Sequence, residues 1–478
     1  MSEDLKHKTK IGFYWKFFEQ FSNYGVQFIV GIIMARLLSP SDFGIAALPA
    51  VFIAVAQVFI DSGFALALIR KPEVSEKDLA TSFYYCIVVG LSLYVVLFLL
   101  APYIATFYGE PILVPLIRVS TLTFLFNPLL TPQSVILNRK LNFKTPAKVT
   151  VFSRILSGVL GICVAYCGFG IWALVATTLS ASILTVLLTS VCVRWIPKEK
   201  WSKDSFQYLW NFGNKMVGAG LLRTIYANIV PVLLGKFGGT AQLGVYNRAI
   251  QFASLPSANF IGIINTVTFP VLSKMVDNPE QLKCNFEKLV KASSFVVFPI
   301  MLIMSALAEP LIITLITDKW ANCIPVLQIM CFTYMFQPVH ILNVNLLQVM
   351  GRPDLILKLE IISKCIFPIF IVLAVQQGII VLCIVDFLIT MISLVLNTYY
   401  SGKLLCVGYI KQVRYLLPSF ILSLAMMVVV LIVISFIENT LIQLLAGSII
   451  GLSFYFGAAY LFRFEELQDV KYMINRKK

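Results

Sequence analysis

The sequence predicts an all-α, polytopic membrane protein. Of its 478 residues, 59% are hydrophobic and 13% are charged, and the mean hydropathy is +0.87. A soluble chain carries about 45–50% apolar and about 25% charged residues, and a soluble core stops growing at about 250–300 residues. So many apolar residues therefore need a bilayer as their solvent, and each spanning helix takes about 20 of them.

Fourteen apolar runs lie between charged or Pro- and Gly-rich breaks, and each run predicts one transmembrane helix. In chain order the runs cover 13–35, 44–69, 82–104, 116–137, 149–166, 171–193, 211–235, 243–269, 289–313, 324–349, 357–376, 378–400, 413–436 and 441–462. Lys16 and Glu19 interrupt the first run and no small-residue cleavage site follows, so we interpret it as a retained helix. The loops are short, which argues against an enzyme with a large extramembrane catalytic region.

The basic residues predict the orientation of these helices. With fourteen spans, 28 of the 38 Lys and Arg residues fall on the side that holds both termini. The opposite loops hold only five, each close to a helix end: Arg36, Arg118, Lys236, Arg248 and Lys319. By the positive-inside rule both termini are cytoplasmic.

Composition also excludes several functions. The net charge of +15 comes from residues between apolar runs, which form no continuous face for nucleic acid. His7 and His340 are the two histidines, too few for a histidine-based metal site. The ten cysteines are scattered without a CxxC spacing and are interpreted as small buried hydrophobes. No nucleotide motif occurs, so an ion gradient or the membrane potential is the expected energy source.

The chain contains a long-range internal repeat. The segment from Arg36 to Ala46 has a counterpart 200 residues later, from Lys236 to Tyr246. Farther along the chain the offset is 210: Phe126-Asn127-Pro128 corresponds to Phe336-Gln337-Pro338, and the Gly168 turn corresponds to Gly378. Chance similarity between apolar helices is the alternative, but turns recur as well as apolar runs. We therefore predict two parallel six-helix lobes around a central cleft, with two appended helices. The predicted boundaries are 1–203, 204–405 and 406–478.

Ionisable residues inside the predicted spans are candidate site residues, because burying them in a bilayer costs several kcal/mol. The cations that we predict to line the cleft and bind substrate are Lys16, Arg36, Arg118, Arg154, Lys215, Arg223 and Arg248. The acids that we consider for ion coupling are Asp61, Glu19 and Asp386. A cleft that is richer in cations than in anions favours an anionic substrate.

Structural roles remain open for each of these residues. Lys16 and Lys215 lie within a turn or two of a cytoplasmic helix end, from which a lysine can reach the interface. Arg36 and Arg248 can anchor the outer interface in the same way. Asp61 precedes Ser62-Gly63, so it can equally be part of a helix-breaking polar spot.

Several motifs resemble those of the polysaccharide-transporter (Wzx-like) flippases, which belong to the multidrug/oligosaccharidyl-lipid/polysaccharide exporter superfamily. They are the stretches 35–44 (ARLLSPSDFG), 61–64 (DSGF), 107–108 (FY), 168–175 (GFGIWALV), 243–249 (LGVYNRA) and 351–354 (GRPD). Each motif alone is weak, but their order and spacing together are fairly specific. The resemblance covers about residues 10–400.

This resemblance implies a multi-pass protein of the bacterial inner membrane, with no cofactor. It would move undecaprenyl-pyrophosphate-linked oligosaccharide from the cytoplasmic to the periplasmic leaflet by alternating access, in contact with membrane lipids and polysaccharide assembly proteins. The family's cationic central cavity fits the basic residues named above. Two alternatives remain: a multidrug exporter of the same superfamily, which would need cleft carboxylates, and a membrane-embedded polysaccharide polymerase or ligase.

Overall fold

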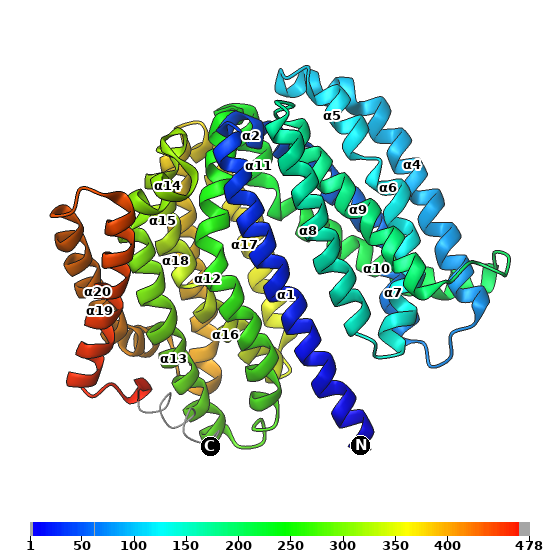
Figure 1. Cartoon of the computed structure of the whole chain (residues 1–478). Coiled ribbons are helices and arrows are strands. Elements are labelled where there is room, and N and C mark those ends of the chain that lie inside the picture. Colours follow the sequence, from blue (N-terminus) through cyan, green and yellow to red (C-terminus); the bar gives the residue numbers. More distant parts are fainter. Residues whose placement is uncertain (1–2, 62, 468–478) are drawn as a thin grey trace. The chain divides into compact units, whose positions relative to one another are not determined.

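The computed structural model describes residues 3–61 and 63–467. All regular secondary structure in these residues is helical (Figure 1). Contacts divide the chain into two compact units, Met1–Gly244 and Val245–Lys478. The predicted lobes, 1–203 and 204–405 with the appended segment 406–478, stay a prediction, because contacts group residues by proximity and not by repeat.

The first unit begins with the longest helix and ends inside α12. Its elements are α1 (Glu3–Leu37), α2 (Pro40–Asp61), α3 (Phe64–Arg70), α4 (Glu76–Tyr108), α5 (Leu113–Ser120), α6 (Thr123–Phe126), the 3-10 turn η1 (Asn127–Leu129), α7 (Leu130–Arg139), α8 (Lys144–Tyr166), α9 (Trp172–Val193), α10 (Lys203–Ala227), α11 (Ile229–Leu233), the π-helical turn η2 (Leu234–Gly238) and the start of α12 (Thr240–Ser273). Within this unit, α8 packs between α1 and α9, and α10 packs against α2, α3 and α4.

The second unit is built around α13 and α18. Its elements after α12 are α13 (Pro279–Ala306), α14 (Ala308–Ile316), the 3-10 turn η3 (Asp318–Trp320), α15 (Cys323–Met335), α16 (Gln337–Val349), α17 (Pro353–Val375), α18 (Ile379–Leu405), α19 (Tyr409–Ser435) and α20 (Thr440–Leu461). Helix α13 contacts α15, α16, α19 and α20, and α18 contacts α15, α16 and α17.

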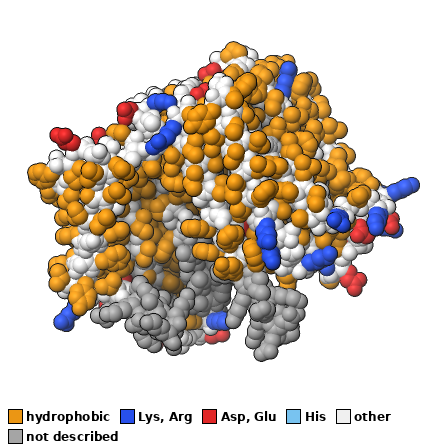
Figure 2. Space-filling model, viewed as in Figure 1, with side chains coloured by type: hydrophobic (Ala, Val, Ile, Leu, Met, Phe, Trp, Pro, Cys, Tyr) orange, Lys and Arg blue, Asp and Glu red, His pale blue; other side chains and the backbone are white. Residues whose placement is uncertain are grey.

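Each predicted span coincides with a helix or a broken helix of the described chain. By length and apolar composition, ten of these stretches can cross a membrane, and α10 with α11 and η2, bent by 48° at their junction, can form an eleventh. Helix α17 is long enough, but Lys358, Glu360 and Lys364 fall in every stretch of it that could span. Apolar side chains cover most of the face shown in Figure 2, as expected where helices face lipid. The predicted fold class, an all-α polytopic membrane protein, is confirmed.

The backbone repeats at the offset that the sequence predicts. Three pairs of turns or helix breaks recur 210 residues apart: Asn127 with Gln337, Leu141 with Gly351, and Gly168 with Gly378. In the first pair, η1 and α16 each begin at a residue followed by proline, which cannot donate a backbone hydrogen bond to the preceding helix. In the other two pairs all four residues have positive φ, from 53° to 107°. Two of the three corresponding pairs therefore share a positive φ, and the third shares a proline at the second position of the new helix.

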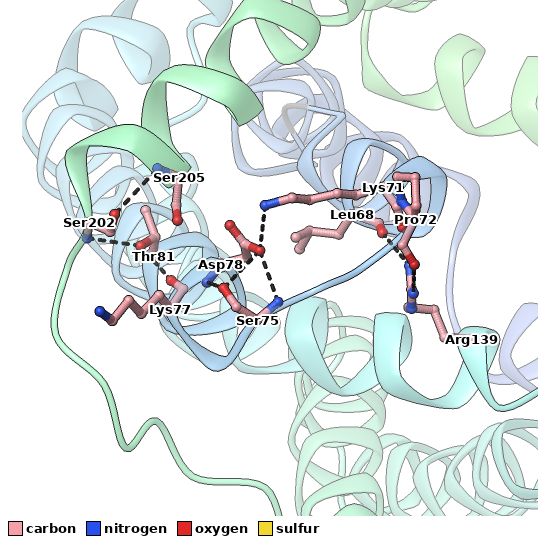
Figure 3. A network of polar contacts seen from close by, with 10 residues as sticks. All are labelled: Leu68, Lys71, Pro72, Ser75, Lys77, Asp78, Thr81, Arg139, Ser202 and Ser205. Atoms are coloured by element: carbon pink, nitrogen blue, oxygen red, sulfur yellow. Dashed lines mark hydrogen bonds and ion pairs between the residues drawn. The ribbon is translucent and has the colours of Figure 1, made fainter.

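The buried carboxylate of Asp78 is at the centre of a polar network in the first unit (Figure 3). Asp78 Oδ2 accepts hydrogen bonds from Lys71 Nζ at 2.7 Å and from the backbone and hydroxyl of Ser75 at 3.0 and 2.9 Å, which forms a capping box at the start of α4. Arg139 on α7 donates to the carbonyls of residues 68, 71 and 72. The backbone N–H of Ser202 donates to Thr81 Oγ1 at 3.1 Å. This network ties the α3–α4 loop to α7 and to the start of α10.

Replacing Asp78 with alanine should lower the free energy of unfolding by about 2–4 kcal/mol. The substitution removes the cap of α4, and it leaves the partly buried Lys71 ammonium without its counter-ion. Thermal unfolding in detergent measures the change, with Lys77→Ala, an exposed neighbour on the same helix, as the control. A melting temperature for Asp78→Ala equal to that of the control would show that the network adds nothing to stability.

Candidate functional site

A polar pocket opens within the first unit among α2, α3, η1, α7 and α10. It has a volume of about 530 Å³, and we call it the Asp61 pocket. Its polar lining residues are Gln57, Asp61, Asn127, Thr131, Ser134 and Arg223. In a segment of mainly apolar helices, such a group of polar side chains is the default candidate for a binding site.

Two glycines let α10 approach α2 closely enough to close this pocket. Gly63 follows α2 with φ of 69°, and a Cβ atom there would lie 2.8 Å from Cβ of Met216. A Cβ atom at Gly220 would lie 2.9 Å from a methyl group of Val58. Larger residues at either position would push α10 away from α2. The glycines thereby bring Arg223 to the same pocket as Asp61.

The two charges in the Asp61 pocket differ in how they are held. Gln57 Nε2 donates a hydrogen bond of 2.8 Å to Asp61 Oδ1. The Arg223 side chain is exposed to the pocket, and within residues 3–61 and 63–467 the structure records no hydrogen bond or ion pair to its guanidinium. Its five N–H donors therefore remain available to an anion. Arginine binds phosphate oxygens in a two-pronged geometry that lysine cannot match.

A second pocket adjoins the first, and we call it the Lys16 pocket. It has a volume of about 260 Å³ and shares two lining residues of α7, Leu130 and Ser134, with the Asp61 pocket. Lys16 Nζ lies 3.0 Å from Glu19 Oε2. The Lys16 side chain is 65% exposed and the Glu19 side chain 16%, so the lysine is the more accessible partner.

Other predicted cations of the first unit lie outside both pockets. Arg154 is exposed on α8, one helical turn beyond Thr150, which lines the Lys16 pocket. Lys215 is exposed on α10, and Arg36 is exposed in the last turn of α1. Arg118 stacks on the Phe98 ring, with its guanidinium carbon 4.1 Å from the ring centre. This contact, of the cation–π kind, accounts for a cation at that position without a substrate.

The two predicted residues of the second unit differ in their surroundings. Arg248 is 5% exposed, lies over the Trp320 ring at 5.6 Å and donates to Gln251 Oε1 at 2.6 Å. Asp386 is half-buried on α18, outside both pockets. Among the predicted residues, the structure thus brings together Asp61 with Arg223 and Lys16 with Glu19, in adjoining pockets.

The uncharged lining residues Gln57, Thr131 and Ser134 have no place in the sequence prediction. Single amide and hydroxyl side chains are common in membrane helices, where they bond to the preceding turn, as Ser134 does with the carbonyl of Thr131 at 2.8 Å. One of the missed residues did carry a signal. Asn127 belongs to the Phe126-Asn127-Pro128 break, which recurs as Phe336-Gln337-Pro338. Its Oδ1 accepts a hydrogen bond of 2.6 Å from Ser182, and the residue lines the Asp61 pocket.

The stretch 35–44, one of the motifs that resemble those of the flippases, has a structural role at the start of α2. There, Ser39 and Asp42 form the capping box of α2: Ser39 N donates to Asp42 Oδ2 at 2.9 Å, and Asp42 N donates to Ser39 Oγ at 3.2 Å.

The similarity to a known protein family extends far beyond this stretch. The family model described as "Polysaccharide biosynthesis protein" matches residues 33–325, more than half of the chain. The chain belongs to this family.

Individual members of the polysaccharide biosynthesis protein family agree with the match. The chain is 27% identical over 325 residues to the teichuronic acid biosynthesis protein TuaB of Bacillus subtilis, which covers 68% of this chain and 67% of that protein. It is 26% identical over 433 residues to the lipopolysaccharide biosynthesis protein WzxC of Escherichia coli, which covers 89% of this chain and 87% of that protein. The resemblance to Wzx-like flippases that the motifs indicate is therefore confirmed.

The fold also matches a solved transporter. The lipid II flippase MurJ in an inward closed conformation superimposes with a TM-score of 0.73, at 16% identity, over 95% of this chain and 99% of that protein. At this identity the similarity concerns the fold alone. It agrees with the multi-pass, all-helical architecture described above.

Proposed function

We propose that this protein is a flippase that moves undecaprenyl-pyrophosphate-linked oligosaccharide from the cytoplasmic to the periplasmic leaflet. The carrying observation is the open guanidinium of Arg223 in a polar pocket among membrane helices, in a chain of the polysaccharide biosynthesis family. Such a pocket suits an anionic head group that must leave water, because it replaces hydration by charged hydrogen bonds. The relatives TuaB and WzxC, named for the biosynthesis of teichuronic acid and lipopolysaccharide, support this substrate class.

Within this proposal, Arg223 binds the pyrophosphate, and Lys16 and Arg154 attract it from neighbouring positions. Arg36, Arg118, Lys215 and Arg248 stay as proposed cleft cations, of which Arg118 and Arg248 already lie over aromatic rings. Any ion coupling would use Asp61, Glu19 or Asp386. Transport would proceed by alternating access of lobes 1–203 and 204–405. No step in it requires bond making or breaking.

A multidrug exporter is the second candidate, and Asp61 is the observation that favours it. A carboxylate in a pocket can bind an organic cation, and Gln57 would hold it in place. The neighbouring Arg223 argues against this use, because it repels a cation entering the same pocket. Loss of drug resistance on deleting the gene, with glycan export intact, would favour the exporter.

The protein is a multi-pass membrane protein, and we place it in the bacterial inner membrane with both termini in the cytoplasm. The distribution of Lys and Arg supports this orientation. Polysaccharide assembly proteins are the expected partners, since the delivered glycan must be polymerised or attached on the far side.

Deletion in the native host tests the proposed function. Lipid-linked glycan should accumulate on the cytoplasmic face, and a plasmid copy of the gene should restore export. In the complemented strain, with the ten native cysteines of the protein replaced, a cysteine introduced at Gln377 should react with an impermeant maleimide from outside, whereas one at Lys200 should not. Unchanged distribution of the lipid-linked glycan in the deletion strain would overturn the proposal.

A further inference from the structure

An apolar groove runs along the first unit between α1, α8 and α9. Its volume is about 530 Å³, and residues that line it include Trp15, Phe152, Ile155 and Leu188. Phe152 and Ile155 are 57% and 47% exposed, so the groove opens to the surroundings of the helix bundle and not to its core. In a membrane this surface faces lipid chains. The structure therefore has an open apolar groove on its surface that can accommodate part of a hydrocarbon chain.

The groove and the Lys16 pocket are both lined by residues of α1, α8 and α9, and neighbouring residues of these helices face the two different spaces. On α1, Trp15 lines the groove and the next residue, Lys16, lines the pocket. On α9, Leu188 and Thr189 divide in the same way, and Val149 of α8 lines both spaces. Neighbouring residues on a helix point about 100° apart, so these helices present an apolar side and a polar side. A ligand with an apolar tail and a polar head can occupy both.

The groove has basic residues at one end. Lys148 is its single charged lining residue, and Lys144 lies one helical turn before it, at the start of α8. Lys144 Nζ lies 5.7 Å from the centre of the Trp15 ring. Tryptophan and lysine together are typical of the level at which lipid head groups meet water. These side chains suit a phosphate at the end of a hydrocarbon chain.

We propose that this groove binds the first isoprenoid units of the lipid-linked substrate. Lys148 then receives the pyrophosphate before it enters the Lys16 pocket. The inference rests on the proposed function, and it adds a tail site to the head-group site. An ordinary phospholipid also joins an apolar tail to a phosphate, and the polyprenyl pyrophosphate glycan differs from it by a second phosphate, which suits the two cations Lys148 and Lys16 that line the adjoining spaces.

Photocrosslinking of the full chain in liposomes tests the tail site. The probe is a polyprenyl diphosphate with a photoreactive group in its first isoprene units. We expect its label on the tryptic peptide 149–154, which contains Phe152. Val151→Trp, which fills the groove from α8, should reduce total labelling about tenfold, equivalent to ~1.4 kcal/mol of binding. Val159→Trp provides the matched control, since Val159 is 52% exposed on the same helix and lies outside the groove lining.

A second pair of variants tests the same groove in case Val151→Trp does not fold. Cys192→Trp fills the groove from α9, and Val191→Trp, beside it and outside the groove lining, is its control. Equal labelling of groove and control variants would overturn the proposal. So would displacement of the probe by phosphatidylglycerol as effective as that by unlabelled polyprenyl diphosphate, because the groove would then hold bulk lipid. Labelling requires binding only, so its outcome is independent of whether the deletion strain exports glycan.

Discussion

Replacing Arg223 with alanine should abolish glycan export while leaving the amount of protein in the membrane unchanged. The guanidinium faces the Asp61 pocket, where it can donate two parallel hydrogen bonds to a pyrophosphate. Hydrogen bonds to charged groups contribute about 1.5–3 kcal/mol each, so loss of the pair should slow transport roughly 100-fold or more. Arg223→Lys should rescue export partly, because it restores the charge without the planar pair of donors.

Appropriate controls separate this binding role from a general effect of charge. Lys198→Ala removes one positive charge from an exposed loop position of the first unit and should export normally. Arg154→Ala should also impair export, through the loss of a cation near the Lys16 pocket. Export can be followed as surface glycan in the complemented deletion strain, with membrane protein measured in the same cells. Normal export by Arg223→Ala would show that the head group is held elsewhere.

The positions of the helices could be predicted because each span consumes about 20 apolar residues between polar breaks. Breaks within spans were partly predictable too. Pro128 and Pro338 lack the N–H that a continuous helix needs, and η1 and α16 begin at the residues before them. The bend between α10 and α11 has a proline as well: Pro231 has no N–H for the carbonyl of Ala227, the last residue of α10, although the predicted span 211–235 treats this stretch as unbroken.

The composition of the site could be predicted only in part. Asp61 and Arg223 stand out as charges within apolar runs, but their shared pocket depends on the packing of Gly63 and Gly220 against side chains that are distant in sequence. A hydropathy pattern shows where the charges lie and with which period the apolar residues recur. It does not show which neighbouring helix a glycine packs against. For this reason the sequence identifies candidate charges without showing which of them meet.

Aromatic partners explain why some candidate cations lie apart from the pockets. Arg118 and Arg248 have the same sequence character as Arg223, an arginine in or near an apolar run. They stack on Phe98 and Trp320, which belong to other helical segments. Rings and arginines are both frequent in this chain, so no spacing rule marks those pairs. The residues Gln57 and Thr131 escape a search for charged side chains because they carry no charge.

A membrane potential of physiological sign should accelerate head-group translocation in proteoliposomes even without a pH or sodium gradient. A pyrophosphate diester carries about two negative charges, and moving one charge across 100 mV is worth ~2.3 kcal/mol. Outward passage from a negative cytoplasm therefore gains roughly 4–5 kcal/mol, which corresponds to about a thousandfold in the distribution between leaflets. Cations such as Arg223 stay with the protein, so they lower the barrier without cancelling this gain over a full cycle.

The measurement compares vesicles with an imposed potential, vesicles collapsed by an ionophore, and vesicles that carry only a pH gradient. Wild-type protein should respond to the potential alone. Asp61→Asn should keep that response if the acid takes no part in coupling, whereas a loss of pH-dependent acceleration in this variant would identify Asp61 as a proton carrier. Translocation that ignores the potential but follows the pH gradient would contradict the account, since the head-group charge would then be compensated by counter-ions moving with it. The gain of two charges would in that case be absent from the cycle, and proton antiport would have to supply the driving force.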